Sequence, residues 1–275
     1  PPVMMSSGVV CYDYLPPDIQ RSYRYEDMMK SVSMEDGKTT FESQLKKSGF
    51  VGAKENRMSP ENTLCDFETH IEQGPILDDA GKDLGVVDCV LGMYHYRVRF
   101  YGQTTHAGTF PMPKRKDAFF AAAKALSYLH EKIDALEIEN LVYTTGEVVC
   151  HPNINTCVPD YFDFSFDVSL KTMEFCGCRC EVEKIWKRDT VWWNEKLVGY
   201  VKEVAEEMEI KHQFIHSGAG HDAQFISYMV PTTMIFAPSV KGLSHCEDEY
   251  TSVEHCTLAA SVMLNAVLKA DSEGV

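Results

Sequence analysis

Four short segments place a histidine or another polar residue beside glycine in otherwise apolar surroundings. Histidine offers a neutral nitrogen that can bind a metal ion or transfer a proton near pH 7. Glycine lets the backbone approach a ligand closely. Each histidine taken alone is more often a hydrogen-bonded structural residue, but the four segments together indicate a functional site. They are Thr69–Pro75, Thr105–Gly108, Ser217–Asp222 and Ser244–Glu247.

The elements that must position these segments are predicted from hydrophobic periodicity. Residues 66–71 and 85–91 are expected to form strands. Apolar and polar side chains alternate over residues 94–100, which is typical of a half-buried strand. Apolar residues three and four apart between Phe119 and Ile133 predict one face of a helix. These patterns therefore predict three strands followed by a helix.

Later segments are assigned in the same way, and they complete a compact α+β unit over residues 93–190. A strand is expected at residues 231–237 between helices marked by residues 197–208 and 256–267, which favours an α/β layer. Residues 39–48 are expected to form a short helix that Gly49 stops. The further strands expected in the α+β unit are residues 141–150 and 162–170, and residues 178–186 are expected to form a final strand or helix.

Composition excludes several classes of protein. The 275 residues include 41 acidic and 26 basic side chains, a net charge of −15, which argues against a nucleic-acid-binding surface. No apolar run reaches the roughly 18 residues of a membrane span. The start has no signal-peptide pattern, and it lacks an initiator Met, which suggests a trimmed or incomplete chain. Ten dispersed cysteines are read as reduced thiols of a cytoplasmic protein.

The order and spacing of the four segments resemble the amidohydrolase branch of the M20 metallopeptidase-like superfamily. That branch contains N-carbamoyl-L-amino-acid hydrolases, β-ureidopropionases and allantoate amidohydrolases. The resemblance covers about residues 65–268. It is carried by His70–Pro75, His106–Thr109 with Pro111–Met112, Ser217–Ala223, and Ser244–His245 followed by Glu249–Thr251.

The resemblance implies an α/β fold that is the C-terminal portion of a catalytic domain with an inserted α+β lid and dimerisation domain. Residues 1–90 would be a partial catalytic domain, residues 91–190 the lid, and residues 191–275 the C-terminal part of the catalytic domain. The implied activity is metal-dependent hydrolysis of non-peptide C–N bonds in linear substrates such as N-carbamoyl amino acids or allantoate. The implied partners are a small-molecule substrate and a second copy, bound through residues 91–190.

The resemblance also assigns roles to single residues. His70 and His245 would each ligate one of two divalent ions, which are zinc, manganese or cobalt in the family. A metal-bound water becomes hydroxide near neutral pH. His106 would reach the active site of the dimer partner and stabilise the oxyanion there. The residues that would contact the substrate are Gln73, Asn155, Gly218, Ala219 and Gly220.

Several features depart from the family pattern. The chain has no His-x-Asp, and its only Glu-Glu, Glu206–Glu207, lies on a predicted helix. The catalytic Glu and three metal ligands are therefore missing, and His70 and His245 alone are expected to hold ions weakly. Asn155 stands four residues before Pro159, where the family has three.

A further departure concerns the substrate carboxylate. The family has Asp-x-Arg where this chain reads Asp167-Val168-Ser169, so a cation that pairs with a carboxylate is absent at Ser169. N-carbamoyl-α-amino acids are therefore expected to bind poorly unless another cation, such as Lys171 or Arg179, takes over.

Three hypotheses about function remain open. The chain is part of a longer active amidohydrolase, a non-catalytic relative that keeps the dimerisation lid, or a member of an aminoacylase or dipeptidase branch. The His70–Gln73 segment argues against the third, because peptidase branches tend to use an acidic ligand there. The cysteines from Cys176 to Cys180 are read as structural, and so are His216, His221 and His255.

Overall fold

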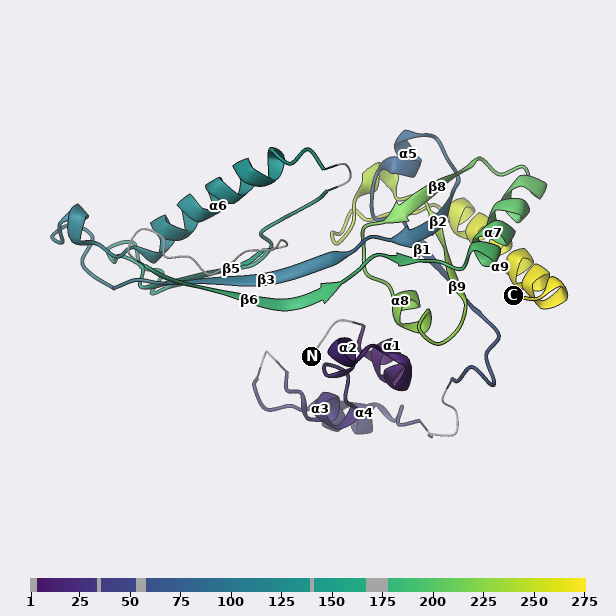
Figure 1. The fold of residues 1–275 in the computed structure, drawn as a ribbon, viewed down its shortest axis with the longest axis horizontal. Helices are drawn as coiled ribbons and strands as arrows, with labels where there is room; N and C mark the ends of the chain where they lie inside the picture. Colours follow the sequence, from purple (N-terminus) through teal and green to yellow (C-terminus); the bar gives the residue numbers. More distant parts are fainter. Residues whose placement is uncertain (1–3, 34–35, 53–57, 139–140, 167–177) are drawn as a thin grey trace. The chain divides into compact units, whose positions relative to one another are not determined.

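The computed structural model describes residues 4–33, 36–52, 58–138, 141–166 and 178–275. The chain divides into two compact units, Pro1–Leu91 with Thr190–Val275, and Gly92–Asp189. We call them unit 1 and unit 2 and describe each by itself (Figure 1). Among the described helices, none is both long enough and apolar enough to cross a membrane.

Unit 1 contains a sheet with the strand order β1-β9-β2-β7, in which β8 also pairs with β2. Strand β1 is parallel to β9, and β2 is parallel to β8, while β2 and β9 run antiparallel. The carboxyl ends of β1 and β9 therefore lie at one edge of the sheet, and those of β2 and β8 at the opposite edge. The bounds are β1 Asp66–Ile71, β2 Leu84–Val90, β7 Val191–Trp192, β8 His212–Ser217 and β9 Thr232–Ala237.

Two amphipathic helices, α7 (Glu195–Glu207) and α9 (Val253–Glu273), pack with this sheet around one hydrophobic core. Their N-termini are capped by side chains: Asn194 accepts from two backbone N–H groups of α7, and Ser252 accepts from one of α9. Leu197, Val201 and Val262 are fully buried in this core. Burial of these faces stabilises the helices far more than their intrinsic propensity does.

The N-terminal region is built of short helices, and its residues Cys11, Leu15 and Tyr23 share a second, smaller core with helix α8 (Ala223–Ile226). Tyr23 stacks edge-on against Phe225 with ring centroids 5.0 Å apart. Gly8 lies against this ring, and a Cβ there would come within 2.0 Å of it. The short helices are α1 Met5–Val10, η1 Tyr12–Tyr14, α2 Pro17–Gln20, α3 Tyr25–Lys30 and α4 Phe41–Ser48, and α5 follows at Ile76–Asp79.

Unit 2 is a four-stranded sheet in the order β4-β5-β3-β6 with helix α6 (Ala118–Asp134) packed on it. All neighbouring strands are antiparallel. Ala121, Ala122 and Leu129 of α6 meet Phe162 and Phe164 of β5 in the core. The bounds are β3 Met93–Tyr101, β4 Val148–His151, β5 Tyr161–Phe166 and β6 Arg179–Arg188.

Most strands and helices predicted from periodicity are confirmed, and the α/β fold class with them. Helix α4 ends at Gly49, whose φ of 77° gives the left-handed cap that glycine favours. One strand prediction was wrong: only the last part of residues 141–150 is a strand, β4, and residues 141–147 are not. Residues 167–170, which include Ser169, are predicted to continue the strand β5, and they lie outside the described residues.

Candidate functional site

Gln73 is held in place by both its backbone and its side chain at the end of β1. Its backbone N–H donates to Ser239 Oγ at 3.0 Å, and its side-chain Nε2 donates to Ser244 Oγ at 2.9 Å. The Ser244 hydroxyl gives its proton to the Glu249 carboxylate at 2.7 Å, so it must accept from Gln73. The side-chain amide of Gln73 therefore has a defined orientation, with Nε2 towards Ser244.

His245 lies next to Gln73 in the same network. Its Nε2 is 3.4 Å from Gln73 Nε2, and its backbone N–H donates to Glu249 Oε2 at 3.1 Å. The Ser244 hydroxyl, then the His245 N–H and the nearby imidazoles, hold the pKa of Glu249 below its usual value. Glu249 is thus a stable anion that organises the loop around His245.

The backbone around Gln73 and His245 adopts a left-handed conformation. The φ angles are 60° at Gln73, 57° at Lys241 and 57° at His245. Such values are uncommon for non-glycine residues and cluster at functional sites, because the surrounding structure must hold them. The loop between β9 and α9 and the end of β1 are therefore a candidate binding site.

His70 precedes this network on β1 and presents one nitrogen for a ligand. Its Nδ1 lies 2.7 Å from the backbone carbonyl of Ile71. A carbonyl only accepts, so Nδ1 carries the proton and Nε2 carries the lone pair. Metal-ligating histidines are commonly oriented in this way. The ring of His70 also packs edge-on against His221, with centroids 4.8 Å apart.

Glu72 has a structural role beside these residues. Its carboxylate accepts hydrogen bonds from the N–H groups of Ile76 at 2.8 Å and Leu77 at 2.9 Å, at the start of α5. Burial raises the pKa of Glu72 above its usual value, although these two hydrogen bonds oppose the shift. The side chain therefore fixes the turn that follows Gln73.

Ser217, which precedes the glycine-rich segment, is joined through His221 to β1. Ser217 Oγ lies 2.7 Å from His221 Nε2, and His221 Nδ1 lies 3.6 Å from Glu68 Oε1. Burial alone would raise the pKa of Glu68, but its contacts with His221 and with the Ala223 N–H lower it below its usual value. The 217–221 segment therefore runs from the end of β8 to β1, where His221 lies next to His70.

The structure brings Gln73 and His245 together in unit 1, with His70 beside His221. His106 and Asn155 belong to unit 2, where their two loops are paired: the Ala107 N–H donates to the Thr156 carbonyl at 2.8 Å. His106 Nδ1 accepts from the Gly108 N–H at 3.0 Å.

A complete two-ion centre is not formed around His70 and His245 by the described residues. Over those residues, a single group of three or more His, Cys, Asp or Glu side chains has its ligand atoms close enough to share an ion. It consists of Asp88, Cys89 and His216, and it includes neither His70 nor His245. Zinc in proteins usually has three or four protein ligands. The described residues therefore do not supply the ligand set of a metal pair.

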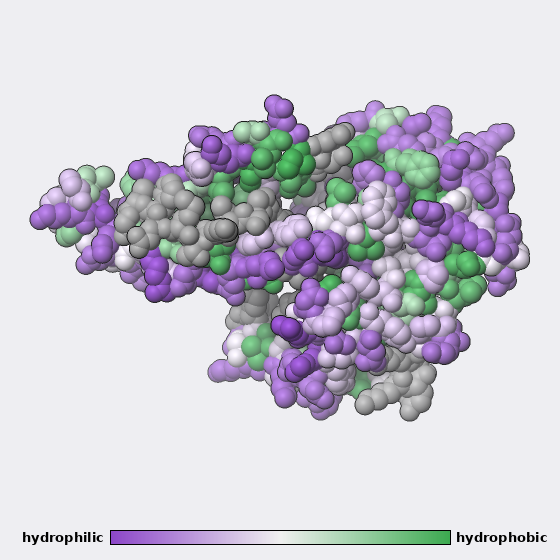
Figure 2. Space-filling model, in the orientation of Figure 1, coloured by the Kyte–Doolittle hydropathy of each residue, from purple (hydrophilic) through white to green (hydrophobic). Residues whose placement is uncertain are grey.

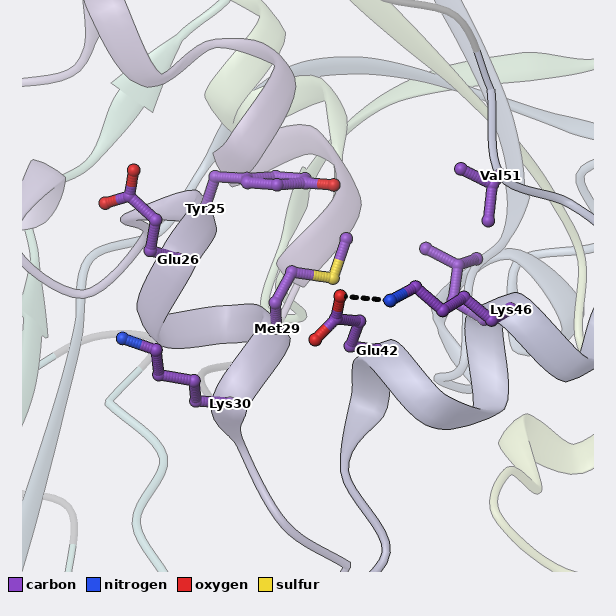
Figure 3. Close-up of a pocket in the computed structure, with 8 residues that line it drawn as sticks. Tyr25, Glu26, Met29, Lys30, Glu42, Lys46 and Val51 are labelled. Atoms are coloured by element: carbon purple, nitrogen blue, oxygen red, sulfur yellow. Dashed lines mark hydrogen bonds and ion pairs between the residues drawn. The ribbon is translucent and has the colours of Figure 1, made fainter.

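A hollow of about 240 Å³ between α3 and α4 contains none of the predicted site residues. Figure 3 shows Tyr25 and Met29 facing Lys46, whose Nζ pairs with Glu42 at 2.6 Å. Charged side chains of both signs and an exposed ion pair line this hollow, so it offers no chemistry of the kind that the four segments predict.

The sequence indicates Gln73 and His245 together with Ser244 and Glu249, but not every residue that holds them. Ser239 was not singled out, and Glu68 carried no signal beyond its position in β1. The i, i+2 spacing of Glu68 and His70 on a strand puts both on one face, and that spacing could have identified Glu68.

Comparison with known proteins agrees with these motifs. Residues 41–269 match the model of the peptidase family M20/M25/M40. The chain is 32% identical to an N-carbamoyl-L-amino-acid amidohydrolase of Rhizobium meliloti, over 98% of the chain and 65% of that protein. It is 32% identical to an allantoate amidohydrolase of Escherichia coli K12, over 71% of the chain and 52% of that protein.

A solved structure has the same fold. The crystal structure of an amidase of the hydantoinase/carbamoylase family from Burkholderia vietnamiensis matches with a TM-score of 0.80 and 27% identity, over 98% of the chain and 66% of that structure. The chain thus spans about half to two thirds of the length of these relatives. On the strength of the matched region and these relatives, the chain belongs to the peptidase family M20/M25/M40.

Proposed function

We propose that the protein hydrolyses non-peptide C–N bonds in linear carbamoyl or ureido compounds, and that this chain supplies much of the substrate-binding region. The relatives named above are amidohydrolases of N-carbamoyl amino acids and of allantoate. The chain covers only part of their length, so the proposed activity is that of the whole protein. Zinc, manganese or cobalt would supply the activated water in that protein.

The observation that carries this proposal is the fixed amide of Gln73. Its Nε2 is engaged by Ser244, and among the described residues no donor contacts Oε1. An oriented amide oxygen can accept a hydrogen bond from the N–H of a ureido group, whereas a carboxylate at this position would instead favour a cationic group. Gln73 therefore matches a neutral carbamoyl or ureido substrate.

The remaining roles follow from the same proposal. His70 and His245 would each be a metal ligand, and His106 would stabilise the oxyanion in the partner's site. Asn155 and the backbone from Gly218 to Gly220 would contact the substrate. The His70 lone pair on Nε2 and the exposed His106 ring are consistent with these roles.

We also propose that unit 2 is the lid and that it forms a homodimer. Figure 2 shows hydrophobic surface near the C-terminal end of α6, and Leu136, Ile138 and Val142, which follow α6 in the sequence, are exposed. Contiguous exposed apolar surface of this kind is typical of protein–protein interfaces. The ten cysteines are dispersed along the chain, which favours reduced thiols, and we propose the cytoplasm.

A second candidate function is a non-catalytic relative that binds but does not hydrolyse. The specific observation in its favour is that the described residues assemble no group of three metal ligands around His70 or His245. Such a protein would bind a ureido compound and form the same dimer without releasing ammonia.

The test is a substrate panel applied to the protein as its source cell makes it. We expect ammonia release from N-carbamoyl-L-amino acids or allantoate with added zinc, manganese or cobalt, and no cleavage of dipeptides. Dipeptide cleavage without ammonia release would overturn the proposal and favour a peptidase. Ligand binding without hydrolysis of either class would favour the non-catalytic alternative.

A further inference from the structure

A bulge in β2 brings two consecutive side chains to the same histidine of β8. The pairing of β2 with β8 runs Val87 to Ile215 and then Cys89 to His216, so Asp88 is an extra residue in β2. In a regular strand, consecutive side chains point to opposite faces. A bulge re-aims a side chain, and bulges are common next to functional sites.

The result is a compact set of three ligand atoms. Asp88 Oδ1 lies 2.6 Å and Cys89 Sγ lies 3.4 Å from His216 Nδ1. Three ligand atoms, one from each residue, lie within 4.8 Å of one another. We infer that Asp88, Cys89 and His216 form a binding site for a single zinc-class transition-metal ion, separate from His70 and His245.

The donor set suits this class of ion. One imidazole nitrogen, one thiolate and one carboxylate are the ligand types of zinc, whereas magnesium and calcium prefer oxygen alone. Zinc bond lengths of about 2.0 to 2.3 Å in a tetrahedral site put the ligand atoms roughly 3.4 to 3.6 Å apart. The thiol and the imidazole already have this separation, whereas Asp88 Oδ1 is closer than this to His216 Nδ1 and must move away from it by less than about 1 Å.

The protonation state of Cys89 and the solvent exposure of the site also agree with the inference. Burial, with the charge of Asp88, raises the pKa of Cys89 to about 12, so without an ion the side chain is a thiol. An ion that binds here displaces the thiol proton to solvent and takes the thiolate as a ligand, as zinc does in protein sites. The side chain of His216 is 43% exposed and that of Asp88 is 24% exposed, which leaves an entry path.

The simplest alternative is that Asp88 and His216 form only an ion pair. That pair does not involve the thiol, so the two explanations differ in the role of Cys89. Trp192 pairs with Cys89 across β2 and β7, and its ring centroid is 6.4 Å from that of His216. A paramagnetic ion at the inferred site should therefore quench the fluorescence of Trp192.

The test is titration of the metal-free chain with Co²⁺, followed by displacement with Zn²⁺ and elemental analysis. We expect one equivalent of Co²⁺, a thiolate-to-cobalt charge-transfer absorption, and quenching of tryptophan fluorescence. Cys89→Ser should abolish the charge-transfer absorption. Asp88→Asn and His216→Ala should weaken binding by at least about 10-fold, because loss of a ligand costs at least as much as loss of a residue that orients one.

Two control variants separate this site from the region of His245. Cys246 is exposed and adjacent to His245, so its thiol could give a cobalt–thiolate absorption near the candidate site. Cys246→Ser and His245→Ala should leave the absorption and its stoichiometry unchanged. Circular dichroism of each variant shows that it is folded.

Four results would overturn the inference. Three concern the charge-transfer absorption: its absence in the folded parent chain, its survival in Cys89→Ser, or its loss in Cys246→Ser. The fourth is equal Co²⁺ affinity of the parent and His216→Ala, because His216 would then not be a ligand. None of these readouts depends on hydrolysis, so they are independent of the proposed function.

Discussion

The hydroxyl oxygen of Ser217 lies 2.7 Å from Nε2 of His221, and both side chains are buried. Ser217 ends β8 at one edge of the sheet, whereas His221 packs against His70 of β1. The Ser217 oxygen also accepts from the Ala219 N–H at 3.1 Å. This pair therefore sets the path of the glycine-rich segment that we propose contacts the substrate.

Removal of the Ser217 hydroxyl should destabilise the fold. Ser217→Ala leaves the buried Nε2 of His221 and the Ala219 N–H without this partner, and an unsatisfied buried polar group costs about 1 to 3 kcal/mol. Urea unfolding measures the loss. Ser227→Ala is the control, because the Ser227 hydroxyl only donates to a carbonyl of its own helix region, Gln224 O at 2.9 Å. Equal losses for the two variants would contradict the assigned role of Ser217.

Asp66 should make stability decrease as the pH rises. Burial, followed by the charges of Glu68 and Asp222, raises the pKa of Asp66 from 3.8 to about 6. Between these values the folded chain keeps a proton that the unfolded chain releases, so the free energy of unfolding falls with rising pH. Asp66→Asn should therefore stabilise the chain by about 1 to 3 kcal/mol at pH 7.5 and have little effect near pH 3.5.

Asp36 is a control, because its effect on the free energy of unfolding should change with pH in the opposite direction to that of Asp66. Hydrogen bonds from the Thr39 hydroxyl and from the N–H groups of Lys38 and Thr39 lower the pKa of Asp36 to about 2. The ionised Asp36 therefore stabilises the fold above pH 4, and this stabilisation is lost as the pH falls towards 2. Asp36→Asn should destabilise the chain at pH 7.5. Urea unfolding at several pH values measures both variants. A destabilising Asp66→Asn at pH 7.5 would show that the ionised form of Asp66 is favoured after all.

Gly242 should tolerate a side chain less well than Gly49. Both have positive φ, 66° and 77°, so alanine costs about 1 to 2 kcal/mol at either position. A Cβ at Gly242 would also come within 2.5 Å of the backbone nitrogen of Pro75, whereas none of the described atoms lies within 4 Å of a Cβ at Gly49. Gly242→Ala should therefore lower the urea midpoint clearly more than Gly49→Ala, and equal midpoints would contradict this packing.

Much of the fold could be predicted because its strands and helices have clear periodicity. Residues 66–71 and 231–237 are strands of the expected type, and the apolar face of α6 lies in the core. Strand β8 was not predicted, because it contains polar residues such as His212 and Gln213, and its Phe214 is exposed. Local sequence could not show that β2 would pair with β8.

The candidate site was only partly predictable for a related reason. The motifs identify Gln73 and His245, but the hydroxyl of Ser239 reaches Gln73 only because β1 and β9 are parallel neighbours. His216 was read as structural, and its contact with Asp88 spans 128 residues and depends on a bulge in β2. No local pattern specifies where such a bulge occurs.

The proposed dimer can be tested by replacing exposed apolar residues of unit 2 with a charged residue. Phe120 on α6 is 54% exposed and Ile185 on the edge strand β6 is 55% exposed. Phe120→Glu or Ile185→Glu should raise the dimer dissociation constant by at least about 10-fold, because a charge at an interface must be desolvated. Sedimentation equilibrium measures the effect. Val253→Glu, at a 79% exposed position of unit 1, is the control. A parent chain that is monomeric at high concentration would contradict the proposal.

The central claim is that the oriented amide of Gln73 recognises a ureido group, and calorimetry with a matched ligand pair tests it directly. An N-carbamoyl-L-amino acid and its N-acetyl analogue differ by an NH₂ group in place of a methyl group. The parent chain, and Gln44→Leu as an exposed control, should bind the carbamoyl compound about 5-fold more tightly, since one hydrogen bond is worth about 1 kcal/mol. Gln73→Leu should bind both compounds equally. An unchanged preference in Gln73→Leu, or no preference in the parent chain, would contradict the account.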